Sequence, residues 1–186
     1  MNNVTTMFCH KGRCITLAMG VAALSLGLIA VGLAFFLNLD ACHLCIFQRL
    51  AYFVIAGCFF LTFASWNKPA LRYASLAASA AFCIWGLIVS AKQSWMQWFP
   101  DSGFTCSLAE TGFTEKLIDW LGQIYPLFFM ATGFCGSKDL VIGGLSLANW
   151  SFLILLTFLA GSASVCIASF STSSNRTALT KTPFIA

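Results

Sequence analysis

The sequence predicts an all-α membrane protein, an antiparallel four-helix transmembrane bundle with one long loop that carries a short surface helix. Hydrophobic residues make up 59% of the 186 residues, charged residues make up 9%, and the mean hydropathy is +0.85. This composition leaves too little polar surface to cover a water-soluble globule. The length suits a single domain, because a spanning helix needs only roughly 20 apolar residues.

The first two spans are predicted from apolar runs and from the residues that close them. Residues 15–37 form an uncharged run that Asp40 follows. The second span covers about residues 43–65 and ends before Pro69, because proline cannot donate the hydrogen bond that a continuing helix requires. Both runs are long enough to cross a bilayer.

The third and fourth spans follow from the same pattern. Residues 73–91 are uncharged and lie between Arg72 and Lys92, and residues 149–170 are almost wholly apolar. A Ser/Thr-rich, basic tail begins around residues 171–174, and we expect that tail to be disordered.

The connections between the spans predict how the helices pack and where the polar chemistry lies. The first connection, about residues 38–42, and the second, about 65–72, are very short, so successive helices must be antiparallel neighbours. The third, about 92–148, is far longer than a linker needs and carries five of the six acidic residues. A short amphipathic helix is expected there, along the membrane surface. Its apolar face would consist of Leu117, Ile118, Trp120, Leu121, Ile124 and Tyr125.

Aromatic residues follow the third span directly. Trp95, Trp98 and Phe99 are typical of an interfacial aromatic belt, and we favour this interpretation over a cofactor site.

Basic residues predict the orientation in the membrane, because cytoplasmic loops are enriched in Lys and Arg. Both termini should therefore be cytoplasmic, and the loops of about 38–42 and 92–148 should be periplasmic. The alternative is a secretory signal with a lipoprotein-like box at Leu39–Cys42, but the apolar run is longer than a usual signal core. The basic residues on the predicted cytoplasmic side are Lys11, Arg13, Lys68, Arg72, Arg176 and Lys181.

The nine cysteines divide into groups according to this topology. Cysteines within spans are usually small buried hydrophobes, and two more cysteines lie in the N-terminal segment. The remaining four belong to the first and third connections, which helix parity places on the same face of the membrane. The groups are Cys58, Cys83 and Cys166 in the spans, Cys9 and Cys14 near the N-terminus, and Cys42, Cys45, Cys106 and Cys135 in the loops.

The spacing of Cys42 and Cys45 favours redox chemistry over an inert structural bridge. In the periplasm exposed thiols are expected to form disulfides, and closely spaced CxxC pairs tend to be reactive. The pair lies where the second helix begins, and a helix N-terminus favours a thiolate. Arg49 follows Cys45 by one helical turn in an apolar stretch, where a cation is costly and suggests function, although it could snorkel to the interface. Gln48 can offer further hydrogen bonds.

These features together suggest that electrons pass between two cysteine pairs. The sequence has no haem-binding CxxCH, iron–sulfur cysteine run or GxGxxG fingerprint. The acceptor that fits best is therefore a two-electron carrier dissolved in lipid, such as a quinone. No metal site and no nucleic-acid partner is expected.

Three segments resemble the disulfide bond formation protein B (DsbB) family. Cys42-His43-Leu44-Cys45-Ile46-Phe47-Gln48-Arg49 resembles the family signature, Pro69–Tyr73 its short cytoplasmic turn, and Ala131–Cys135 the segment around its fourth essential cysteine. The resemblance covers about Asn38 to Trp150. Two positions depart from the family pattern: Ala41 replaces a frequent proline, and Gln48 replaces a glutamate found in some members.

The resemblance implies a four-helix thiol:quinone oxidoreductase of the bacterial inner membrane. It would reoxidise a periplasmic DsbA-type thiol oxidase and pass the electrons to ubiquinone or menaquinone. Cys106 would be attacked by the reduced partner, Cys135 would exchange with Cys42, and Cys45 would pass electrons to a quinone near Arg49. Arg49 and the neighbouring Gln48 are the residues expected to bind the quinone. His43 either tunes the potential of the pair or occupies a variable position.

Two other classes of protein share some of these features. A tetraspanin-like organiser would also have four helices and a large cysteine-bearing loop, but its CCG signature is missing. A metal transporter using Cys42, His43 and Cys45 would need further ligands within the spans, and the spans lack them.

Overall fold

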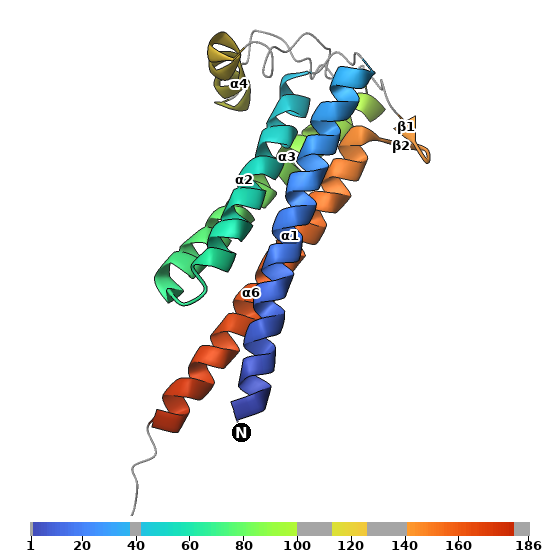
Figure 1. Cartoon of the computed structure of the whole chain (residues 1–186). Coiled ribbons are helices and arrows are strands. Elements are labelled where there is room, and N and C mark those ends of the chain that lie inside the picture. The colour runs from blue at the N-terminus through green and yellow to red at the C-terminus, as the bar shows by residue number, and fades with distance from the viewer. Residues whose placement is uncertain (1, 38–41, 100–112, 126–140, 181–186) are drawn as a thin grey trace, which may run out of the picture.

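The computed structural model in Figure 1 describes residues 2–37, 42–99, 113–125 and 141–180. Within these ranges the chain forms four long helices, one short helix and one small β-hairpin. The elements are α1 (Asn2–Phe36), α2 (His43–Ala64), α3 (Pro69–Trp98), α4 (Phe113–Ile124), β1 (Val141–Ile142), β2 (Leu145–Ser146) and α6 (Leu147–Thr180).

The four long helices pack as an antiparallel bundle, as the short connections predicted. The helix α1 packs on α2, α2 on α3 and α3 on α6, while α1 also contacts α6. The N-terminus, the α2–α3 turn and the C-terminal end of α6 lie toward one end of the bundle, and α4 and the hairpin lie at the other (Figure 1). The predicted fold class is confirmed.

The surface of the bundle is apolar and part of its interior is polar, which is the distribution expected in lipid. Large apolar side chains point outward, as in Phe36, Ile88 and Ile167, whereas Thr62 and Ser79 are fully buried. Each long helix contains a stretch long and apolar enough to cross a membrane. These stretches are Gly12–Phe36, His43–Ala64, Pro69–Trp98 and Leu147–Ile167, with mean hydropathies of 1.8 to 2.3.

Buried hydroxyl groups join neighbouring helices in this interior. The Thr62 and Ser75 hydroxyls lie 2.7 Å apart and link α2 to α3. The Tyr52 hydroxyl lies 2.9 Å from the Ser151 hydroxyl and links α2 to α6. Each pair satisfies the hydrogen bonding of hydroxyl groups that would have no partner in lipid. The helix α2 is thus hydrogen-bonded to α3 on one side and to α6 on another.

The turn between α2 and α3 follows the predicted breaks. The helix α2 ends at Ala64, with Ser65 at its C-cap, and Pro69 is the first residue of α3, where its missing N–H costs nothing. At its other end α3 continues to Trp98, beyond the predicted limit near residue 91. Charged Lys92 therefore marks where the apolar stretch ends and not where the helix ends.

The prediction of a disordered C-terminal tail is wrong up to Thr180, because α6 continues to that residue. Residues 171–180 contain no glycine or proline, and the first proline after them is Pro183. Loss of hydrophobicity alone does not break a helix, because the backbone hydrogen bonds can continue without an apolar face.

The hairpin formed by β1 and β2 was not predicted. Gly143 and Gly144 connect the strands with φ angles of 62° and 83°, a left-handed backbone that glycine adopts without steric cost. Two glycines between short apolar pairs are a known hairpin signal, so the sequence did contain this information.

Candidate active site

The two cysteines of the CxxC motif meet at the N-terminal end of α2. Cys42 is the N-cap residue, with extended backbone angles, and its sulfur accepts the backbone N–H of Cys45 at 3.3 Å. This capping interaction satisfies one of the free amides at the helix start. The sulfur atoms of Cys42 and Cys45 lie 2.8 Å apart, so the motif is poised for dithiol–disulfide chemistry.

Cys42 is buried within a compact apolar cluster at this end of the bundle. The cluster includes Leu44, Phe47 and, from α4, Ile118, and Cys42 is only 2% exposed. The Phe47 and Trp85 rings, with centroids 4.7 Å apart, join α2 to α3 beside it. Another thiol can reach the Cys42 sulfur only if part of this cluster opens.

The protonation of Cys42 differs from the expectation that a helix N-terminus favours a thiolate. Its hydrogen bond to the Cys45 sulfur, together with burial, raises the pKa of the Cys42 thiol above its ordinary value. The backbone N–H of Cys45 acts in the opposite direction but does not prevail. For Cys42 the buried neighbour therefore outweighs the helix terminus.

The Cys45 sulfur is surrounded by hydrogen-bond donors. Cys42 Sγ lies 2.8 Å from it, and the side-chain Nε2 of Gln93, from α3, donates to it at 3.0 Å. Gln93 was not predicted as a site residue. The sequence signal that could have found it is a glutamine close to the end of an apolar run, but nothing in the sequence pairs it with a cysteine of another helix.

Gln48, predicted to bind the quinone, forms a hydrogen bond with Gln93 of α3. It is buried, and its Nε2 donates to Oε1 of Gln93 at 2.9 Å. The structure therefore joins Gln48 to the cysteine pair through Gln93.

Arg49 lies one helical turn beyond Cys45 on α2 and is partly buried. Within the described part of the chain, no hydrogen bond or ion pair to its guanidinium is found. The guanidinium is consequently a positive charge near the two sulfurs, with no acidic partner in the ranges that the structure describes. Such a group can stabilise negative charge that develops on a neighbouring molecule.

The short helix α4 packs against α2 at the end that holds the cysteine pair, and its prediction as a helix is confirmed. His43 Nε2 lies 2.8 Å from Asp119 Oδ1, and the Trp85 indole donates to the Thr114 hydroxyl at 3.2 Å. The fully buried Ile118 supplies the apolar part of the contact. Trp120 and Ile124 of α4, and Tyr125 just after it, are exposed, as a helix lying on a membrane surface requires.

Two predicted site residues, Cys106 and Cys135, lie outside the described residues. Among the cysteines predicted to be packing groups, Cys83 is fully buried, and Cys58 and Cys166 are partly buried in the spans. In the described ranges no three His, Cys, Asp or Glu side chains come together as a possible metal site.

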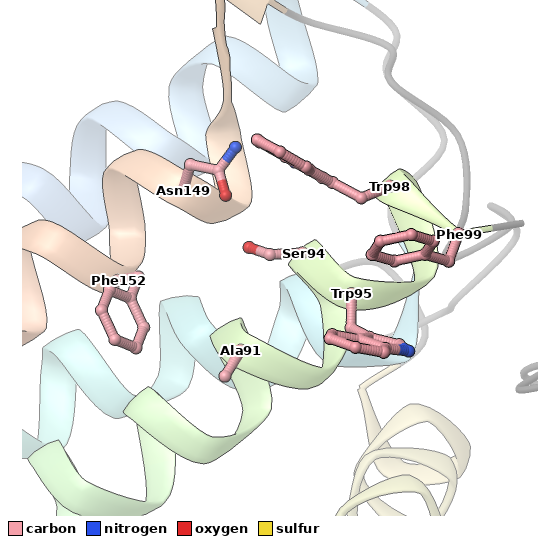
Figure 2. Close-up of a pocket in the computed structure, with 7 residues that line it drawn as sticks. All are labelled: Ala91, Ser94, Trp95, Trp98, Phe99, Asn149 and Phe152. Carbon is pink, nitrogen blue, oxygen red and sulfur yellow. The ribbon is translucent and has the colours of Figure 1, made fainter. Parts of the chain in front are cut away.

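A surface pocket of about 370 Å³ lies between α3 and α6 near the same end of the bundle. In Figure 2 Trp95, Trp98 and Phe99 line one side of it, and Ser94 and Asn149 turn their polar atoms toward its interior. All three aromatic side chains are more than half exposed, as expected for an interfacial belt. None of the described site residues lines this pocket.

The fold and the site define a class of protein: a multi-pass membrane oxidoreductase with a CxxC dithiol at the end of a transmembrane helix. Comparison with known proteins identifies the family. The model of the family described as "Disulfide bond formation protein DsbB" matches residues 12–165, and the chain belongs to this family.

Individual relatives agree with this assignment. Disulfide bond formation protein B of Dechloromonas aromatica is 44% identical over 137 residues, which cover 73% of this chain and 81% of the relative. The protein of the same name from Albidiferax ferrireducens is 32% identical over 72% of this chain and 76% of its own. The Salmonella typhimurium protein is 29% identical over 86% of this chain and 89% of its own.

Proposed function

We propose that this protein is a thiol:quinone oxidoreductase that reoxidises a periplasmic DsbA-type thiol oxidase. The observation that carries the proposal is the Cys42–Cys45 pair, with sulfur atoms 2.8 Å apart at a helix start. Arg49 lies one turn away and has no ion pair among the described residues. Membership of the DsbB family supports the proposal. The net reaction converts the partner dithiol and a quinone into the partner disulfide and a quinol.

Each exchange step forms one sulfur–sulfur bond and breaks another. The reduced partner attacks Cys106, and the second pair, Cys106 and Cys135, takes up its two electrons. The Cys135 thiolate then attacks Cys42, so that the Cys42–Cys45 bond breaks and its electron pair stays on Cys45. The Cys106 thiolate next attacks Cys135, which restores the Cys106–Cys135 bond and releases Cys42 as a thiolate. Cys42 and Cys45 together then give two electrons and two protons to the quinone and form their disulfide again. Cys42 is buried in the apolar cluster that also contains Ile118, so this cluster must open before Cys135 attacks.

The residues around Cys45 suit a quinone as the final acceptor, either ubiquinone or menaquinone. A quinone accepts two electrons and two protons, and negative charge on its oxygen develops as electrons arrive. Arg49 carries a positive charge close to the sulfurs and has no acidic partner among the described residues. We propose that Arg49 binds the quinone oxygen and stabilises that charge.

The cysteine loops are proposed to lie on the periplasmic side of the bacterial inner membrane, and both termini in the cytoplasm. Three described basic residues that flank the spans, Arg13, Lys68 and Arg72, lie toward the end of the bundle that holds the termini, whereas Arg49 and Lys92 lie toward the other end. At the end that holds the termini, the Arg13 guanidinium lies 4.5 Å from the centre of the Phe63 ring, and Arg72 donates to the Trp66 carbonyl. This asymmetry follows the positive-inside rule.

The proposal is tested by mixing the purified protein with a reduced DsbA-type protein and a soluble quinone, and following the loss of quinone absorbance. We expect turnover in the wild type and none in Cys45→Ala. Cys58→Ala is the matched control, because Cys58 lies in the same helix but away from the site, and it should turn over normally. Arg49→Met should lower kcat/KM for quinone by roughly tenfold or more, as expected for loss of one interaction with developing charge.

A tetraspanin-like structural role predicts the opposite result. Its cysteines would be permanent bridges, so no quinone would be consumed with any dithiol donor, and the cysteines of the protein would stay oxidised throughout. That outcome would overturn the enzymatic proposal.

A further inference from the structure

Gln93 is a buried polar residue whose side-chain amide is hydrogen-bonded at both ends: its nitrogen contacts the cysteine pair and its oxygen contacts Gln48. It projects from α3 toward α2 and is 4% exposed. Its Nε2 lies 3.0 Å from Cys45 Sγ and 3.8 Å from Cys42 Sγ, and its Oε1 accepts a hydrogen bond from Gln48. A buried amide satisfied in this way has a fixed orientation.

Gln48 determines which end of the Gln93 amide faces the sulfurs. Because the Gln48 Nε2 donates at 2.9 Å, the group that receives it must be the carbonyl oxygen of Gln93. The Gln93 amino group then points at the cysteines. A donor in this position stabilises a negatively charged sulfur, whereas a carbonyl oxygen would repel it.

The Gln93 amino group lies closer to the sulfur of Cys45 than to the sulfur of Cys42. The contact to Cys45 is shorter than the contact to Cys42 by 0.8 Å, from 3.8 to 3.0 Å. Cys42 also donates its own proton toward Cys45. In the reduced pair, a thiolate at Cys45 thus accepts two side-chain hydrogen bonds, one from Cys42 and one from Gln93. When Cys42 Sγ is bonded to another sulfur it carries no proton, and the Gln93 hydrogen bond remains.

We propose that Gln93 is the hydrogen-bond donor that makes Cys45 the leaving sulfur of the pair, and that Gln48 is a positioning residue that acts through it. The inference rests on the proposed function and assigns residues to its central step. When a thiolate forms a bond to Cys42 Sγ, the Cys42–Cys45 bond breaks and the electron pair stays on Cys45. The Gln93 N–H stabilises that thiolate, which then holds the electrons for the quinone.

The test measures Cys45 directly, in reduced protein whose Cys106 and Cys135 are replaced by serine. The rate of Cys45 alkylation is followed against pH by mass spectrometry, and quinone turnover is measured separately in the chain that retains all four cysteines. Gln93→Leu should slow Cys45 alkylation at neutral pH by roughly tenfold or more, as expected for loss of a hydrogen bond to a charged group, and should move the profile toward alkaline pH. Gln93→Glu should slow it further, because a carboxylate repels the thiolate.

Two further variants separate positioning from simple packing. Gln48→Leu leaves Gln93 in place but frees its amide to rotate, so it should give a smaller shift in the same direction. Ser90→Ala is the control, because Ser90 is equally buried, lies one turn earlier on α3, and its hydroxyl has no hydrogen-bond partner in the described part of the chain. It should leave the profile unchanged.

The outcomes distinguish this inference from the proposed function. A Gln93→Leu profile identical to wild type would overturn the inference even if quinone turnover were normal. A shifted profile in a protein whose wild type never consumes quinone would support the role of Gln93 and overturn the proposed function. If Gln93→Leu fails to fold, Gln93→Glu and Gln48→Leu decide, and unchanged profiles in both would overturn the inference.

Discussion

His43 Nε2 lies 2.8 Å from Asp119 Oδ1, so one of the two residues between the cysteines contacts the short helix α4. The pair connects the start of α2 to the long loop across 76 residues of sequence. It lies at the surface, with side-chain exposures of 30% and 50%, while Ile118 beside it is fully buried. The docking of α4 at the start of α2 thus combines this exposed polar contact and the Trp85–Thr114 hydrogen bond with the buried apolar contact of Ile118.

Loss of the polar contact should loosen α4 only slightly. We expect Asp119→Asn to weaken its docking by less than about 1 kcal/mol, because a partly exposed polar contact is screened by solvent. Hydrogen exchange of the α4 amides measures the change. Lys116→Ala is the control, since Lys116 is an exposed charge on the same helix without an ion pair in the described ranges. A large increase in amide exchange in Asp119→Asn would contradict the expectation that the His43–Asp119 contact contributes less to docking than the burial of Ile118.

Loss of the apolar contact should have a much larger effect. Ile118→Ala removes a fully buried side chain from the cluster around Cys42, at a cost of about 2–5 kcal/mol. We expect α4 to undock and alkylation of Cys42 in the reduced protein to become faster. Ile124→Ala, on the exposed side of the same helix, should leave this rate unchanged. Equal rates in both variants would mean that α4 does not shield Cys42.

The two cysteines should respond differently to pH. Because the pKa of Cys42 is raised, its thiol stays protonated through neutral pH, and its reactive thiolate forms only on the alkaline side. Alkylation of the reduced pair near neutral pH should therefore label Cys45 first, and labelling of Cys42 should grow as pH rises. Mass spectrometry of the digested protein distinguishes the two sites. Cys45→Ala removes the largest cause of the shift, so Cys42 should then react at lower pH.

The hydroxyl pair between α2 and α6 should contribute measurably to stability. Tyr52→Phe leaves the Ser151 hydroxyl without its side-chain partner, and we expect a loss of about 0.5–1.5 kcal/mol in the free energy of unfolding. Thermal unfolding in detergent measures it. A double-mutant cycle with Ser151→Ala isolates the pair, because the second substitution should cost less once the first is made. Strict additivity would show that the two hydroxyls do not interact.

The close packing of α3 and α6 depends on Gly86. A Cβ at this position would lie 2.8 Å from a methyl carbon of Leu155, itself fully buried, so Gly86→Ala should destabilise the bundle by about 1–3 kcal/mol. Gly57→Ala is the matched control, because nothing lies within 4 Å of a Cβ there. It should stabilise α2 by up to about 1 kcal/mol through helix propensity. Thermal unfolding of the two variants should shift in opposite directions.

Much of the fold was predictable because lipid imposes a simple rule on the sequence. A spanning helix must be apolar over its whole length, so uncharged runs indicate the spans, and Pro69 marks the turn between α2 and α3. The lengths of the connections then fix the antiparallel order. The ends of α3 and α6 were less predictable, since a helix can continue past the apolar stretch on backbone hydrogen bonds alone.

The sequence by itself determined the four spans, the position of the CxxC motif at a helix start, and the placement of Arg49 one turn deeper. These are local properties, because spacing within one helix fixes which residues share a face. Only the tertiary structure decided that Gln93 reaches Cys45, that Gln48 hydrogen-bonds Gln93, and that Ile118 of α4 joins the buried cluster around Cys42. Each of these contacts joins different helices, and their residues meet only when the helices pack at one particular rotation and depth. Neither quantity is encoded in the periodicity of a single segment, because every face of these helices is apolar enough to meet either lipid or a neighbour.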